Sequence, residues 1–199
     1  LIPNDAYELV TKLINNMNIV LTQIVPGLKI GVKNLGNELS ADSTVRTKIE
    51  IVSLKNSKEI PLKFESEGIK KIISILQLLI VLYNKASITV AVDEFDSGVF
   101  EYLLGEMLRI ISEKGKGQLI FTSHNLRPLE TLDKSFIAFT TTNPDNRYIR
   151  FTNIKTNNNL RDFYYRDIVL GEQNEPVYDP TNNYEIALAF REAGELSGS

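Results

Sequence analysis

The stretch Ile88-Thr89-Val90-Ala91-Val92-Asp93-Glu94 is a short β-branched run that ends in two carboxylates. A run of this kind is typical of a central strand buried on both faces of a sheet. In open α/β sheets, ligands bind beyond the carboxyl ends of the strands. Asp93 is therefore a candidate Mg²⁺ ligand, and Glu94 a candidate for polarising an attacking water. The alternative is that the pair only ends the strand and caps the next helix.

A second apolar strand, expected over 118–122, leads into Thr122-Ser123-His124-Asn125. His124 is the only histidine of the chain and falls at the same edge of the same predicted sheet. A neutral imidazole there can hydrogen-bond a phosphate oxygen or hold the attacking water. The alternative is a structural histidine bonded to a nearby loop. We favour the functional interpretation because His124 lies beside the carboxylate pair.

The hydrophobic periodicity around these strands predicts an α/β fold with a parallel sheet. Before them it predicts a helix over 4–24, capped by Asn4 or Asp5. Three antiparallel strands are expected next, over 28–32, 45–51 and 60–64, followed by a strongly apolar helix over 69–83. Between the two strands it predicts a helix over 99–111, and after them a short helix over 126–132. A hairpin is expected from 135–141 and 148–152, with its turn at 143–146, and two more helices over 160–168 and 184–193.

Composition excludes several classes of protein. With 43% hydrophobic and 24% charged residues the chain can bury a core, and a net charge of -3 leaves no overall electrostatic footprint of a nucleic-acid binder. The most apolar run, 72–83, contains Gln77 and is too short to cross a bilayer, so we expect no membrane association. There is no cysteine, which excludes a thiolate metal site and suits a cytoplasmic location, and a single histidine excludes a His-rich zinc site.

A third motif, Glu65-Ser66-Glu67-Gly68-Ile69-Lys70-Lys71, stands directly before the apolar helix. Free backbone N–H groups at a helix start, together with a hydroxyl and nearby lysines, favour an anion. The alternative is ordinary N-capping by Ser66.

In their order and intervals, the three motifs resemble the C-terminal part of ABC-type AAA ATPase heads. The branch in question contains the overcoming-lysogenization-defect family, abortive-infection ATPases, and the RecF and SMC heads. The likeness covers about residues 4–155 in layout, although the specific motifs occupy three short stretches. It implies that Ser66 and Gly68 match the signature motif, which contacts the γ-phosphate of ATP bound to a partner subunit. It also implies that Asp93 matches the Walker B magnesium aspartate, Glu94 the catalytic glutamate and His124 the switch histidine.

The chain departs from the family pattern at three places. It contains no G-x-x-x-x-G-K-[ST] loop, so the P-loop strand is absent from this chain. The signature is Glu-Ser-Glu-Gly instead of Leu-Ser-Gly-Gly, and Phe95-Asp96-Ser97-Gly98 stands at the D-loop without its usual sequence, so we assign it no role. Because the chain begins with Leu1, we expect it to be a C-terminal portion of a longer ATPase.

The predicted fold is therefore α/β, a P-loop NTPase-like parallel sheet with helices and a small antiparallel β portion. We expect one head portion over 1–199: a helix with antiparallel strands (1–64), a signature, Walker B and switch-histidine core (65–142) and a C-terminal cap (143–199). The resemblance implies that the full protein binds ATP and Mg²⁺, hydrolyses ATP, and forms a homodimer that sandwiches the nucleotides. It implies work in DNA maintenance or phage defence, with DNA and a nuclease or toxin protein as partners. The isolated fragment should be inactive.

Two other functions remain open. A non-catalytic interaction module would keep the ATPase architecture without its chemistry. A metal-dependent nuclease would use Asp93, Glu94 and Asp96, but it needs more convergent carboxylates than the sheet edge offers. Interleaved Arg and Tyr side chains can contact nucleic acid, although we favour a solvated helix face with the aromatic rings packed inward; these residues are Arg147, Tyr148, Arg150, Arg161, Tyr164, Tyr165 and Arg166.

Overall fold

The computed structural model describes residues 1–39, 44–56, 58–150, 159–170, 175, 177–178 and 181–197. The chain divides into two compact units, Leu1–Pro128 and Leu129–Ser199, and each is described by itself. The end of the expected hairpin strand, at 151–152, and much of the connectors expected at 156–159 and 171–183 lie outside the described residues. Within them, no helix combines the length and the apolar character needed to cross a membrane.

The first unit begins with an amphipathic helix, α1 (Ala6–Ile24), which buries Ile14, Met17 and Leu21 at three- and four-residue spacing. Our expectation of a side-chain cap was wrong. Asp5 holds the N-cap position without a side-chain hydrogen bond, and the carboxamide oxygen of Asn4 instead accepts a hydrogen bond from the Thr47 hydroxyl at 2.7 Å. The polar side chain that precedes α1 thus attaches it to the neighbouring sheet.

Four antiparallel strands form that sheet: β1 (Ile2–Pro3), β2 (Lys29–Leu39), β3 (Val45–Lys55) and β4 (Lys58–Pro61). β3 pairs with each of the other three, so the expected antiparallel order of β2, β3 and β4 is confirmed and β1 is added to it. The last strand, β4, ends at Pro61 and not at residue 64 as predicted. Because Pro61 has no N–H to continue the ladder, Leu62–Phe64 forms a 3₁₀ turn and Phe64 is exposed.

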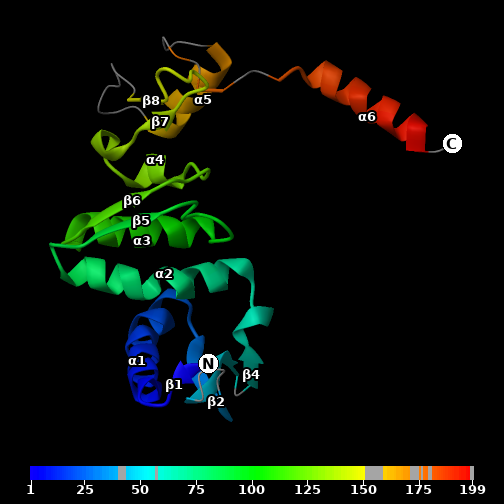
Figure 1. Cartoon of the computed structure of the whole chain (residues 1–199). Coiled ribbons are helices and arrows are strands. Elements are labelled where there is room, and N and C mark those ends of the chain that lie inside the picture. The colour runs from blue at the N-terminus through cyan, green and yellow to red at the C-terminus, as the bar shows by residue number, and fades with distance from the viewer. Residues whose placement is uncertain are drawn as a thin grey trace. The chain divides into compact units, whose positions relative to one another are not determined.

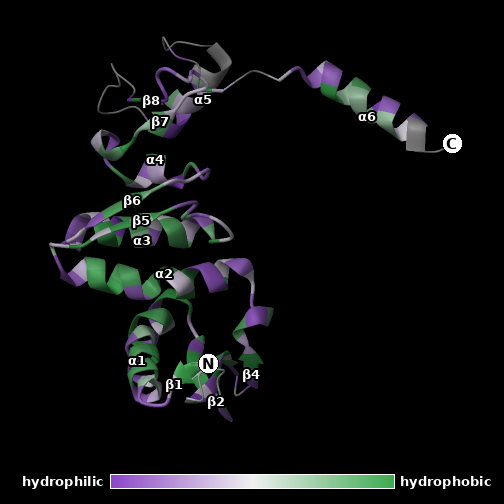
Figure 2. Ribbon diagram, in the orientation of Figure 1, coloured by the Kyte–Doolittle hydropathy of each residue, from purple (hydrophilic) through white to green (hydrophobic). Residues whose placement is uncertain are grey.

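The α/β portion of the first unit consists of α2 (Glu67–Asn84), β5 (Thr89–Val92), α3 (Glu101–Lys114) and β6 (Gln118–Phe121). β5 and β6 are parallel and paired from Thr89 opposite Gln118 to Val92 opposite Phe121, as the helix-strand alternation predicts. In Figure 1, α2 lies between the antiparallel strands with α1 on one side and β5 with α3 on the other. Figure 2 shows the middle of α2 as strongly hydrophobic, as expected for a helix with neighbours on both sides.

The prediction that β5 is buried on both faces was wrong. Val90 and Val92 are buried, whereas Thr89 and Ala91 are exposed, and on β6 Ile120 is 54% exposed. A β-branched run fits a covered face and an open face equally well, so composition alone did not distinguish them. In the part of the chain that the structure describes, helices cover one face of this two-stranded sheet.

The second unit contains a hairpin of β7 (Phe139–Thr140) and β8 (Tyr148–Ile149), and the helices α5 (Leu160–Leu170) and α6 (Asn183–Ser197); the short α4 (Arg127–Thr131) spans the boundary between the units. β7 is shorter than predicted because Asp133 accepts a hydrogen bond from the Ser135 backbone N–H and caps a 3₁₀ turn, Lys134–Phe136.

The aromatic side chains of α5 pack within this unit. Tyr164 stacks on Phe139 with ring centroids 5.1 Å apart, and the Arg166 guanidinium lies 4.8 Å from the Phe163 ring. Arg161 forms an ion pair with Glu130 at 2.9 Å. The Tyr164–Phe139 contact attaches α5 to the hairpin and gives Tyr164 a packing role, whereas Tyr148 and Tyr165 are exposed.

Candidate functional site

The structure brings Asp93, Glu94 and His124 to one edge of the parallel sheet. Asp93 and Glu94 directly follow β5, and His124 lies three residues beyond the end of β6. Because β5 and β6 run parallel and in register, their carboxyl ends meet. The Nε2 atom of His124 lies 4.0 Å from Oε1 of Glu94, and the two side chains are 87% and 57% exposed. The imidazole and the carboxylate are thus neighbours in an open site.

Thr122 joins both carboxylate residues to β6. Its hydroxyl donates to Oδ1 of Asp93 at 2.5 Å and accepts from the backbone N–H of Glu94 at 2.8 Å. Its main chain continues the ladder, since its N–H donates to Val92 and its carbonyl accepts from Phe95. One hydroxyl therefore orients the Asp93 carboxylate and the Glu94 backbone together, and among the described residues none bonds the second carboxylate oxygen of Asp93. Sequence analysis did not single out Thr122, although its place one residue beyond β6 is visible in the sequence.

The backbone of Glu94 has a φ of +46°, in the left-handed region that residues with a side chain rarely adopt. This conformation turns the chain sharply after Asp93 and directs Phe95 inward, where it is fully buried and packs edge-on against Phe121 with ring centroids 5.6 Å apart. Such strain persists only where the surroundings hold it, and it is common at functional sites.

Asp96 receives two backbone hydrogen bonds from the loop that follows β6. The N–H of His124 lies 3.2 Å from Oδ2, and the N–H of Asn125 lies 3.0 Å from the same oxygen. Asn125 in turn accepts from the N–H of Arg127 at 2.7 Å, at the start of α4. Sequence analysis gave Asp96 no assigned role in the ATPase interpretation, because a bond between segments 28 residues apart leaves no local signal.

Ser66 and Gly68 stand at the start of α2. Ser66 Oγ accepts from the backbone N–H of Ile69 at 3.4 Å, so the capping interpretation of Ser66 describes its contact in this structure. Gly68 is buried, and a Cβ atom there would lie 1.9 Å from the carbonyl oxygen of Gly98. Gly98 itself has a φ of +69°. The two glycines thus let the start of α2 and the loop after β5 touch backbone to backbone.

Lys71 makes a second link between α2 and the carboxylate edge. Its Nζ donates to the backbone carbonyl of Asp93 at 2.8 Å. Together with the Gly68–Gly98 contact, this bond places the signature-like motif and the Walker B-like motif side by side in one chain.

Glu65, directly before Ser66, attaches the start of α2 to the antiparallel sheet. Its side chain is 7% exposed and lies 2.9 Å from Lys55 Nζ. It also accepts from the hydroxyl of the fully buried Ser53 at 2.5 Å. The Ser53 hydrogen bond, and then the Lys55 bond, hold the pKa of Glu65 below its ordinary value. The sequence pattern around Glu65 does not predict this role, because Ser53 and Lys55 lie on a different element.

The residues at the sheet edge can hold a magnesium ion only if water and substrate phosphates supply the remaining coordinating oxygens. Mg²⁺ is typically held by one or two carboxylates together with water and substrate phosphates. Asp93, with its second oxygen, matches that pattern. Among the residues that the structure describes, no three His, Asp or Glu side chains converge to hold a metal by themselves. A nuclease centre built from Asp93, Glu94 and Asp96 therefore receives no support from this geometry.

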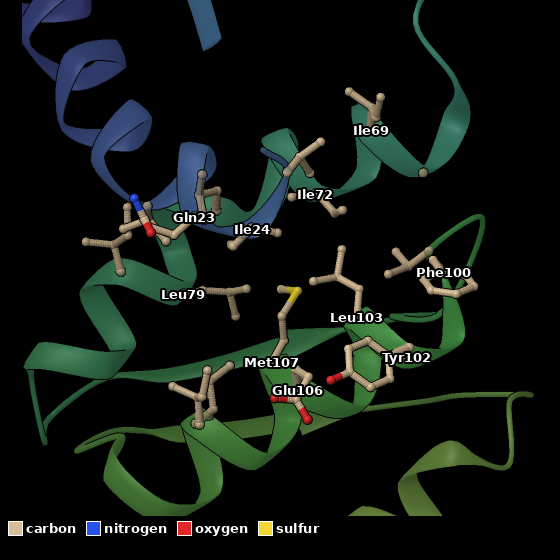
Figure 3. A pocket seen from close by; sticks show the side chains of 18 of the residues that line it. Gln23, Ile24, Ile69, Ile72, Leu79, Phe100, Tyr102, Leu103, Glu106 and Met107 are labelled. Atoms are coloured by element: carbon tan, nitrogen blue, oxygen red, sulfur yellow. The ribbon is translucent and has the colours of Figure 1, made fainter. Parts of the chain in front are cut away.

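A separate apolar groove of about 880 Å³ lies between the end of α1, α2 and α3. Figure 3 shows Ile24, Leu79 and Met107 from these three helices pointing into the same space. Ser66 and Gly68 line it, whereas Asp93, Glu94 and His124 do not. The groove therefore borders the start of α2 and is distinct from the carboxylate edge.

No protein-family model matches the chain, and no curated protein matches it. Solved structures do. An SMC ATPase structure, which concerns ATP-driven dimerization and DNA-stimulated activation, aligns with a TM-score of 0.56 at 11% identity, over 85% of this chain and 99% of that chain. The chain has the fold of the C-terminal part of an SMC ATPase head.

Two further SMC heads align over a smaller share of their own length. The Smc head domain with a coiled coil and joint derived from Pyrococcus yayanosii has a TM-score of 0.50 at 13% identity, over 72% of this chain and 27% of that chain. The SmcHead bound to the C-winged helix domain of ScpA has a TM-score of 0.46 at 14% identity, over 62% of this chain and 37% of that chain. The chain thus spans about a third of the length of these two heads. At such low identity the likeness concerns the fold alone.

Proposed function

We propose that the chain is the C-terminal part of an ATPase head that binds ATP with Mg²⁺, hydrolyses ATP and dimerises around the nucleotide. The observation that carries the proposal is the meeting of Asp93, Glu94 and His124 at the carboxyl edge of a parallel sheet, with Thr122 bonded to both carboxylate residues. An SMC-type head fold makes this edge the expected place for a nucleotide.

Each residue has a distinct part in this mechanism. Asp93 would hold Mg²⁺, and the ion would supply positive charge beside the phosphates. Glu94 orients the attacking water and accepts its proton. His124 donates a hydrogen bond to an oxygen of the γ-phosphate, where charge develops in the transition state.

The signature-like motif serves the other head of the dimer. The start of α2 carries the Ser66 hydroxyl, and the N–H groups of a first helical turn in general favour an anion. In the proposed arrangement Ser66 and Gly68 of one head contact the γ-phosphate held by the second head. The phosphate-cradling loop is supplied by a segment outside these 199 residues, because the sequence contains no such loop.

The proposed setting is the cytoplasm, in DNA maintenance or phage defence. A cysteine-free composition suits a reducing compartment. One of the SMC ATPases with this fold is described as activated by DNA, which supports DNA as a partner here. A nuclease or toxin protein would be the effector that the ATPase controls.

The test uses Glu94→Gln in a protein that carries this chain together with its phosphate-binding loop. Removing the base while keeping the shape of the side chain should trap ATP and leave a dimer stable enough for light scattering. Glu113→Gln, an exposed change on α3, is the matched control and should hydrolyse ATP and dissociate like the wild type. A Glu94→Gln protein that turns over ATP at the wild-type rate would refute the assigned role.

A non-catalytic interaction module is the second candidate, and the apolar groove beside the start of α2 favours it. In that case the head fold is a scaffold and the groove holds a partner. If a Glu94→Gln protein still performs its function without hydrolysing ATP, that result would favour the non-catalytic interaction module.

A further inference from the structure

We propose that Asp96 is the residue that positions His124, and that it acts through the backbone of the loop that carries the imidazole. One carboxylate receives the N–H groups of two consecutive residues: His124 N lies 3.3 Å from Oδ1 and 3.2 Å from Oδ2, and Asn125 N lies 3.0 Å from Oδ2. Hydrogen bonds to an ionised carboxylate are stronger than those between neutral groups. Two of them on adjacent peptides fix the direction in which the His124 side chain leaves the loop.

The imidazole itself has little to hold it. It is 87% exposed, and its distance of 4.0 Å to Glu94 is longer than a hydrogen bond. Among the described residues, the hydrogen bonds of His124 are made by its backbone N–H. The place of His124 opposite Glu94 is therefore set by the main chain.

Asp96 stands on rigid neighbours, which a positioning residue requires. The preceding Phe95 is fully buried, and its N–H donates to the Thr122 carbonyl at 3.0 Å. The carbonyl of Asp96 accepts from the N–H of Val99 at 3.0 Å, and Val99 is buried. The loop between the two carboxylates Glu94 and Asp96 is thus fixed on both sides, so one carboxylate faces the imidazole and the other holds its backbone.

The loop after β6 also contains a local turn that is held by its own hydrogen bonds. The Ser123 hydroxyl donates to the Asn125 carbonyl at 3.2 Å and accepts from the Asn125 N–H at 3.1 Å. Removing the Asp96 carboxylate would leave this local turn intact while releasing it from the loop after β5. A use of this positioning in ATP hydrolysis rests on the proposed function, whereas the positioning itself does not.

The test is NMR spectroscopy of the 199-residue chain without nucleotide, because its only histidine gives a single set of imidazole signals. In the wild type, Glu94→Gln should shift the imidazole resonances of His124. In an Asp96→Ala background that response should disappear, and the amides of His124 and Asn125 should exchange with D₂O about 10-fold faster or more. Asp96→Asn keeps one acceptor oxygen and should lose part of both effects. Ser97→Ala, an exposed change in the same loop, should alter neither.

Two results would overturn the proposal. One is an imidazole that responds to Glu94→Gln equally in the wild type and in Asp96→Ala, or in neither. The other is a collapse of the dispersed spectrum in Asp96→Asn, which would make Asp96 a general structural residue. If only Asp96→Ala unfolds, the comparison is decided on Asp96→Asn, where partial loss supports the proposal and no loss refutes it. None of these outcomes involves ATP, so a failure here leaves the proposed ATPase standing.

Discussion

At the scale of single residues, the candidate site is held together by side chains that hydrogen-bond from one segment of the chain to another. Thr122 contacts both carboxylate residues, Asp96 holds the histidine loop, and Glu65 attaches the start of α2 to the antiparallel sheet. The exposed His124 and Glu94 depend on these supports.

Thr122→Val should weaken both stability and activity. Valine keeps the shape but removes a hydroxyl that donates to Asp93 and accepts from Glu94. The loss should be about 1 kcal/mol of unfolding free energy, measured by urea denaturation, and about 10-fold or more in ATP turnover of the complete enzyme. Thr89→Val, an exposed position on β5, is the control and should be near neutral. Equal effects of the two changes would contradict the bridging role.

The ionisation of Glu65 should make the free energy of unfolding depend on pH. Because its folded-state pKa lies below the ordinary value of 4.5, its contribution is present above that value and is lost as pH falls through the folded pKa. Glu65→Gln should therefore lower the urea midpoint at pH 7, and the difference from the wild type should shrink as pH falls below 4.5. A difference that stays constant across this range would show that the charge of Glu65 is not what stabilises the start of α2.

At the scale of elements, two close approaches position the signature-like helix. Lys71 reaches the Asp93 carbonyl, and Gly68 meets Gly98 without room for a side chain. The start of α2 and the loop after β5 therefore move together if either moves.

Gly68→Ala tests this contact. A Cβ atom 1.9 Å from the Gly98 oxygen forces the backbones apart, so we expect a loss of about 1–3 kcal/mol in unfolding free energy. Gly31→Ala is the control in the same unit, because its Cβ would meet Val52 and Leu54 at ordinary contact distances of 3.4 and 3.5 Å. Thermal unfolding distinguishes them, and a Gly68→Ala protein as stable as the Gly31→Ala protein would contradict the account.

Two kinds of sequence pattern predicted elements well. Continuous apolar runs predicted the apolar helix and the two parallel strands, and alternation of apolar and polar residues predicted the antiparallel order of β2, β3 and β4. The errors arise where a non-local contact decides: Asn4 bonds Thr47 instead of capping α1, and the open face of β5 depends on what covers it. The same holds for the site, where the position of His124 was predictable and its support by Asp96 was not.

At the scale of the whole molecule, the proposed function requires the chain to supply one side of a nucleotide site. It has the carboxylate edge and the helix start, but its sequence contains no phosphate-cradling loop. We therefore expect the 199 residues alone to release no phosphate from ATP above background in a colorimetric assay. Robust turnover by this chain would contradict the need for an additional loop.

The most direct test of the composite site is complementation between two inactive versions of the complete protein. Ser66→Arg blocks the signature-like helix start, and Glu94→Gln removes the base, so each homodimer should be inactive. In a mixed dimer both lesions fall in one site and the other site is intact. Random mixing of a two-fold dimer should then restore roughly a quarter of wild-type ATP hydrolysis. No restoration, or full activity of Ser66→Arg alone, would contradict a site built from Glu94 of one head and Ser66 of the other.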